Sequence, residues 1–242
     1  MEFKMKTIPL LLILLISSCS KFKVPEFSNP TIAINKSNAD LIIEAYTYRA
    51  AARFNIQEWY SDYGTDYPTS IVETYTSYCD SGGEIFGDIQ DEIIRSDRNY
   101  IEADIKYTNC NFANSVTIVG DIYLEGTYYL SNYDHYFTNE GNFEVSTNIA
   151  KFKYTQHFAE FDYVESPFEL KAQEYAKIEI SQYNSSIGTV NYYTDIQRQE
   201  TEANTEGTDI IEGKDGTAIK VVYSNNAIKY YLDNSLYYES TL

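Results

Sequence analysis

The sequence predicts a mostly β protein, folded as an antiparallel meander, a sandwich or a curved and partly closed sheet, with one helix near the N-terminus. The first observation is a period of two, in which apolar residues alternate with polar ones, as around Ile101, Ala103 and Ile105. The second is the abundance of aromatic residues, with 25 tyrosines and 12 phenylalanines, because these side chains favour strands. The third is the turn sequences that separate the alternating runs, such as Gly82-Gly83 and Asp215-Gly216.

One helix is expected over residues 39–54. Ser37 and Asn38 offer an N-cap, Asp40 supplies an acidic first turn, and apolar residues then recur with helical spacing from Leu41 onward. We expect the apolar stripe to pack on a sheet face, and a partner-binding helix is the alternative.

The remaining elements are expected to be strands. Residues 91–98 suggest a hairpin tip, and residues 197–208, whose single apolar member is Ala203, suggest an exposed loop with a cation site as its alternative role. The expected strands cover residues 69–79, 84–90, 101–110, 116–124, 127–130, 133–138, 141–147, 150–156, 158–164, 168–173, 176–183, 190–196, 210–211, 218–223, 227–232 and 236–238.

The first 18 residues have the three-part layout of a signal peptide. Lys4 and Lys6 form a basic start, residues 8–16 are apolar, and the small residues Ser17 and Ser18 precede Cys19. A membrane-spanning helix needs about 20 apolar residues, so this run is too short to span. Met5 is an alternative start.

The end of this segment, Ile16-Ser17-Ser18-Cys19, resembles the lipobox of bacterial lipoproteins. The resemblance implies cleavage before Cys19, a diacylglyceryl group on its sulfur, and attachment to the membrane through lipid. Ser20, in place of aspartate, implies delivery to the outer membrane of the cell envelope. Residues 19–37 would then be the lipidated cysteine and a tether, and residues 38–242 a single domain. An ordinary signal peptide with a chance cysteine, or a buried strand, are the alternatives.

The two other cysteines, Cys79 and Cys110, are expected to form a disulfide in an oxidising envelope. A loop of this length corresponds to roughly 3–4 kcal/mol of stabilisation; two free thiols or a metal pair are the alternatives. Residues 79–83 together with Asn109-Cys110 resemble a pattern in β-rich proteins of Gram-negative envelopes, a resemblance that brings no activity with it.

Aromatic residues gather before the first strand, where Trp59, Tyr60, Tyr63 and Tyr67 lie within a few residues of one another. Such a group can form a ligand-binding platform, because these rings give stacking area at low entropic cost. The alternative is a loop that closes the edge of the core. The neighbouring carboxylates do not complete a calcium loop, so no metal site is predicted.

The composition and the absent motifs restrict the function. A formal charge of −18 disfavours nucleic acid as a partner, and no nucleophile-elbow, zinc or nucleotide-binding motif is present. We therefore expect no catalytic residue and no cofactor. The expected role is a non-catalytic binding, adhesion or structural module, with an envelope protein or a glycan as partner. A periplasmic carrier of an apolar ligand is the first alternative, and a carboxylate-based hydrolase the second.

Overall fold

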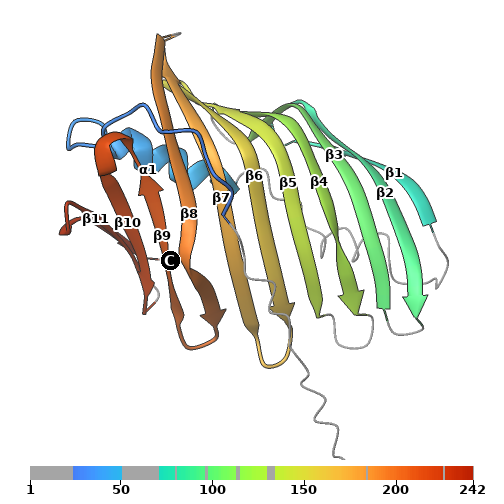
Figure 1. Ribbon diagram of the computed structural model, residues 1–242. Coiled ribbons are helices and arrows are strands. Elements are labelled where there is room, and N and C mark those ends of the chain that lie inside the picture. The colour runs from blue at the N-terminus through green and yellow to red at the C-terminus, as the bar shows by residue number, and fades with distance from the viewer. Residues whose placement is uncertain are drawn as a thin grey trace, which may run out of the picture.

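The computed structural model describes residues 24–50, 71–79, 81–95, 98–112, 115–129, 134–183, 185–225 and 227–241. In this part of the chain the strands form one sheet of twelve, in the order β1 to β12, and every pairing is antiparallel between neighbours in the sequence. The mostly β fold is therefore confirmed. Of the three predicted architectures, the sheet is a curved meander (Figure 1).

The strands are long, and short turns connect most of them. Their bounds are β1 Ile71–Tyr78, β2 Glu84–Arg95, β3 Arg98–Phe112, β4 Val116–Tyr129, β5 His135–Ser146, β6 Ala150–Val164, β7 Glu169–Gln182, β8 Ser185–Thr201, β9 Thr205–Glu212, β10 Ala218–Ser224, β11 Ala227–Leu232 and β12 Ser235–Thr241. The described chain also contains the 3₁₀ turns η1, Tyr48–Ala50, and η2, Lys214–Gly216.

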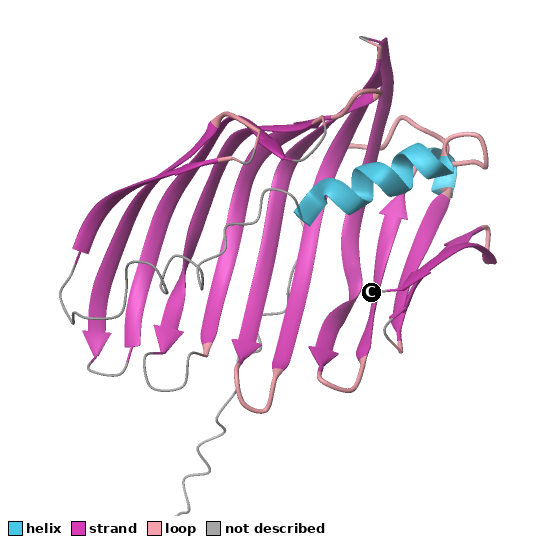
Figure 2. Ribbon diagram, turned by 180° about the vertical axis from the view of Figure 1, so that it is seen from behind, coloured by secondary structure: helices cyan, strands magenta, loops and turns pink. Residues whose placement is uncertain are grey.

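The helix α1, Ala39–Thr47, crosses one face of the sheet (Figure 2), and we call this the helix face. Its Ile42, Ile43 and Tyr46 are buried, and η1 continues it to Ala50. Asn38 precedes the helix but makes no capping bond through its side chain, which instead bonds to Asn35 and to the carbonyl of Ala33. No described helix has both the length and the apolar character to span a membrane.

The alternating pattern of the strands puts the core on the helix face. In β3, Ile101, Ala103 and Ile105 are almost completely buried, and Glu102 and Asp104 point to the opposite face, which we call the outer face. The same alternation continues through β7, where Ala176, Ile178 and Ile180 are buried. β3 and β7 therefore each contribute one buried side and one more exposed side to the sheet.

Part of the expected tether belongs to the folded unit, so the boundary predicted after residue 37 is wrong. Ile32 and Ile34 are buried, and the backbone amides of Thr31 and Ile32 donate to the carbonyl of Thr189 at 3.0 and 3.2 Å. These two isoleucines pack on the core because the chain follows the sheet before it reaches the helix.

The exposed loop predicted at residues 197–208 is also wrong. β8 extends to Thr201 and β9 begins at Thr205, so only a tight turn separates them. The segment lacks an apolar pattern because its inward positions hold polar and charged residues, among them Arg198 and Thr205.

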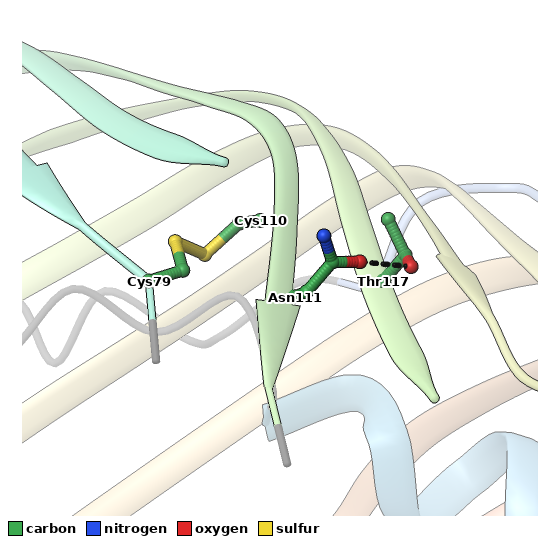
Figure 3. The surroundings of a disulfide bond; sticks show 4 residues. All are labelled: Cys79, Cys110, Asn111 and Thr117. Atoms are coloured by element: carbon green, nitrogen blue, oxygen red, sulfur yellow. Dashed lines mark hydrogen bonds between the residues drawn. A yellow bond between two sulfur atoms is a disulfide. The ribbon is translucent and has the colours of Figure 1, made fainter. Parts of the chain in front are cut away.

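The predicted disulfide is confirmed. Cys79 and Cys110 are joined across a sequence separation of 31, with their Cα atoms 5.4 Å apart (Figure 3). The neighbouring turn is tight, because a Cβ on Gly83 would lie 1.9 Å from the carbonyl oxygen of Asn109. Beside it, the Thr117 hydroxyl donates to Oδ1 of Asn111 at 2.6 Å. The bond fastens the first hairpin to β3.

Candidate functional site

The predicted lipid-bearing residue and the predicted aromatic platform cannot be placed. Cys19, Trp59, Tyr60, Tyr63 and Tyr67 all lie outside the described residues, so these assignments stay predictions. The structure instead draws attention to two other places, one on each face of the sheet.

On the outer face, one side chain from each of six adjacent strands falls into a single row across the sheet. The strand register places each member directly opposite the next. In order from β2 to β7, the row is Asp88, Asp104, Tyr123, Glu140, Phe158 and Tyr175. Adjacent strands are about 4.8 Å apart, so the row extends about 24 Å across the sheet.

This row lines a groove of about 860 Å³, which we call the outer groove. Phe86, Asp121 and Asn142 from the next positions along the strands widen it, and Phe86 is 41 % exposed. Gly141 contributes to the floor, where a Cβ would lie 2.2 Å from the carbonyl oxygen of Asp121. The groove has the size of a ligand site.

Aromatic rings and the N-terminal segment close one end of the outer groove. Phe158 and Tyr175 are stacked with their ring centroids 5.3 Å apart, and Phe27 approaches Tyr175 edge-on at 5.8 Å. Pro25 lies in the lining. The chain that leads back to Cys19 therefore leaves the described structure at this end of the groove.

The electrostatic character of this face is strongly acidic. Asp88 lies opposite Asp104 in the register, and Glu102 lies opposite Glu125 in the adjoining row. The Tyr123 hydroxyl donates to Glu125 at 3.4 Å. Burial first, and then the charges of Glu102 and Glu125, raise the pKa of Tyr123 to about 12.

On the helix face, two arginines and two carboxylates form a buried charge cluster. Nε of Arg49 donates to Oε2 of Glu174 at 3.0 Å, and Arg198 binds the other oxygen of the same carboxylate. Asp209 lies 3.9 Å from Arg49 and 3.7 Å from Arg198, measured between nitrogen and oxygen. The side chains of Glu174 and Asp209 are fully buried, so the two positive charges balance two negative ones.

Tyrosines connect this cluster to the helix. The Tyr46 hydroxyl of α1 donates to Asp209 and lies 2.6 Å from that of Tyr223, which accepts from Arg49 at 2.9 Å. The Tyr154 hydroxyl of β6 donates to the carbonyl of Ala45. Burial raises the pKa of Tyr46 and of Tyr154 well above the usual value for tyrosine. These contacts dock α1 and η1 onto the strands from β6 to β10.

A smaller hollow of about 250 Å³ lies at the edge of the charge cluster. Arg49, Arg198 and Glu200 line it together with Leu170 and Ile228. Its volume is below the several hundred Å³ that a carrier pocket between helix and sheet would need, and three charged side chains interrupt its mostly apolar lining.

The fully buried carboxylates Glu174 and Asp209 already contact other side chains of the protein. Glu174 contacts both arginines, and Asp209 contacts Tyr46. Among the described residues, no group of three or more histidine, cysteine, aspartate or glutamate side chains is arranged to hold a metal ion. The described residues therefore form an open groove on one face and a buried ion cluster on the other.

The sequence gives only partial evidence for the outer groove and for the buried charge cluster. Polar residues at alternating positions, such as Asp104 and Lys106, identify an outer face. Which of them meet across strands depends on the register, and bulges shift that register between β5 and β6 and between β6 and β7. Arg198 was missed because its segment lacks an apolar pattern.

Comparison with known proteins gave no relative: no family model, no curated protein and no solved structure matches the chain.

Proposed function

We propose that the protein is a non-catalytic binding protein of the bacterial cell envelope, anchored by lipid at Cys19, which holds its partner in the outer groove. The observation that carries this proposal is the groove of about 860 Å³ along a row of side chains from six adjacent strands. Its lining combines aromatic rings with polar groups, the combination found in ligand sites.

The position of Pro25, near the start of the described chain, supports the same proposal. Pro25 borders the groove, and six residue steps separate it from Cys19. A chain of that length spans at most about 22 Å. An anchor at Cys19 would therefore keep the groove near the membrane surface, where envelope partners are concentrated.

The two alternatives are less well supported. A carrier needs an apolar cavity of at least about 300 Å³ between helix and sheet, and the hollow described at that place is smaller, with Arg49, Arg198 and Glu200 in its lining. For a hydrolase, Glu174 and Asp209 are already bound to arginines or Tyr46, so only carboxylates such as those of the outer groove would be available to a substrate.

Site-specific photo-crosslinking in intact cells tests the proposal. A photoreactive residue at Phe86, which is 41 % exposed in the groove, should capture a partner, and one at Tyr238 of β12, which is 52 % exposed, serves as the matched control. We expect a crosslinked species from position 86 that the substitution Tyr123→Leu abolishes. Identical products from both positions, or none from position 86, would contradict a binding role for the groove.

The anchor has a separate test. Mass spectrometry of the mature N-terminus should find a diacylglyceryl group on the Cys19 sulfur, and Cys19→Ala should release the protein from the membrane fraction. An unmodified thiol at Cys19 would refute the anchor.

A further inference from the structure

We infer that the outer groove binds an extended, positively charged peptide segment, in which lysine or arginine side chains lie toward one end and apolar or aromatic ones toward the other. This inference rests on the proposed function and gives its ligand a chemical class. Charge, ring surface and length each support it.

The charge of the groove is the first support. Its central row contains Asp88, Asp104 and Glu140, and the row beside it contains Glu102, Glu125 and Glu160. Like charges directly opposite each other on a sheet are destabilising, and a bound cation removes that repulsion. Lys106 is the one lysine in the lining and lies opposite Asp121, so the remaining carboxylates attract a cationic ligand.

The aromatic rings are the second support. Tyr123, Phe158 and Tyr175 occupy the same row as the carboxylates, and Phe86 lies at the carboxylate end of the groove. Ring faces attract ammonium and guanidinium groups through their quadrupole and also pack against apolar side chains. Both kinds of side chain in the inferred peptide thus have a partner in the lining.

The length of the row is the third support. An extended peptide advances about 3.3 Å per residue, so a row of about 24 Å accommodates about seven residues. Ligands that carry phosphate are repelled by these carboxylates. A neutral glycan could stack on the rings, but it would leave the opposed carboxylates without a counter-charge.

Titration calorimetry tests the inference with the mature chain carrying Cys19→Ser. The probes are a seven-residue peptide with lysines in one half and phenylalanines in the other, the same peptide with glutamate in place of lysine, and a neutral hexasaccharide. The test variant combines Asp88→Asn with Asp104→Asn. The control variant combines Glu206→Gln with Glu212→Gln on the exposed side of β9, so it removes the same charge away from the groove.

We expect the lysine peptide to bind, the glutamate peptide not to bind, and the test variant to weaken binding about tenfold while the control variant does not. Raising the salt concentration should weaken binding further. Equal weakening in both variants would mean general attraction to an acidic protein and would overturn the inference. Saccharide binding that Tyr123→Leu abolishes would also overturn it, while leaving the groove as the binding site. Absence of binding by every probe, combined with no crosslink from position 86, would overturn both proposals.

Discussion

The two faces of the sheet differ in how their charged side chains are arranged. On the helix face, Arg49, Glu174 and Asp209 are buried and Arg198 is 13 % exposed, and the four charges neutralise one another. On the outer face, carboxylates such as Asp88 and Asp104 lie opposite carboxylates. An unpaired buried charge costs several kcal/mol, whereas water screens like charges at a surface. Burial therefore requires ion pairing on the helix face, whereas exposure to water permits an excess of negative charge on the outer face.

The largest effect should come from breaking the buried cluster. Arg49→Ala leaves Glu174 and Asp209 buried with one positive charge fewer, and we expect it to lower the free energy of unfolding by about 3–5 kcal/mol. Urea denaturation measures this. Lys151→Ala is the matched control on the outer face, since Lys151 forms an exposed pair with Glu144 at 3.1 Å, and its loss should cost about 1 kcal/mol or less. Equal losses would refute the contrast between the faces.

The next effect concerns the end of the sheet that α1 does not cover. Cys79→Ser combined with Cys110→Ser opens a loop with a sequence separation of 31, which should lower the free energy of unfolding by roughly 3–4 kcal/mol. The wild-type protein under reducing conditions should show the same loss. If both forms keep the stability of the oxidised protein, the disulfide does not stabilise this end.

Alkaline pH should weaken the helix face next. The pKa of Tyr46 and of Tyr154 is raised in the folded state, so below about pH 10 both tyrosines are protonated in the folded and unfolded states. Above that pH the unfolded chain loses these protons first. The free energy of unfolding should then fall by about 1.4 kcal/mol per pH unit for each tyrosine.

Denaturation curves between pH 8 and pH 11 measure this slope. Tyr154→Phe should reduce this slope by the contribution of one tyrosine, about 1.4 kcal/mol per pH unit. A slope that the substitution leaves unchanged would exclude Tyr154 as a source of the alkaline instability.

The smallest effect should be a gain in stability on the outer face. Asp88→Asn removes one of two opposed carboxylates, so we expect the free energy of unfolding to rise by less than about 1 kcal/mol. The gain should shrink in high salt, because ions already screen the repulsion. A loss of stability would mean that Asp88 makes a favourable contact within the folded protein.

Much of the fold could be predicted because the pattern of the strands is local. Alternation at Ile101, Ala103 and Ile105 reports burial of one side of a strand whatever its neighbours are, and turn residues such as Gly82 and Gly83 require a particular backbone. The β-rich class followed from such signals, and the meander was one of the three architectures that they allowed. The disulfide between Cys79 and Cys110 followed instead from the small number of cysteines and the expected oxidising compartment.

One error arose where charged residues face inward, and the other where isolated apolar residues are buried. Arg198 and Asp209 belong to long strands, yet no apolar pattern marks their segment, because each is stabilised by a partner far away in the sequence. Ile32 and Ile34 were assigned to a tether because two isolated isoleucines carry no periodicity, and only contact with the sheet shows that they are buried.

The sequence by itself determined the class of the protein, the faces of its strands and the pairing of its two interior cysteines, since these depend on residues close together in the chain or on elimination among few thiols. The tertiary structure decided where β8 and β9 begin and end, how α1 is docked, and which six side chains share the row of the outer groove. The physical reason is that register and ion pairing join residues from distant parts of the chain, and a one-residue shift would replace every member of the row.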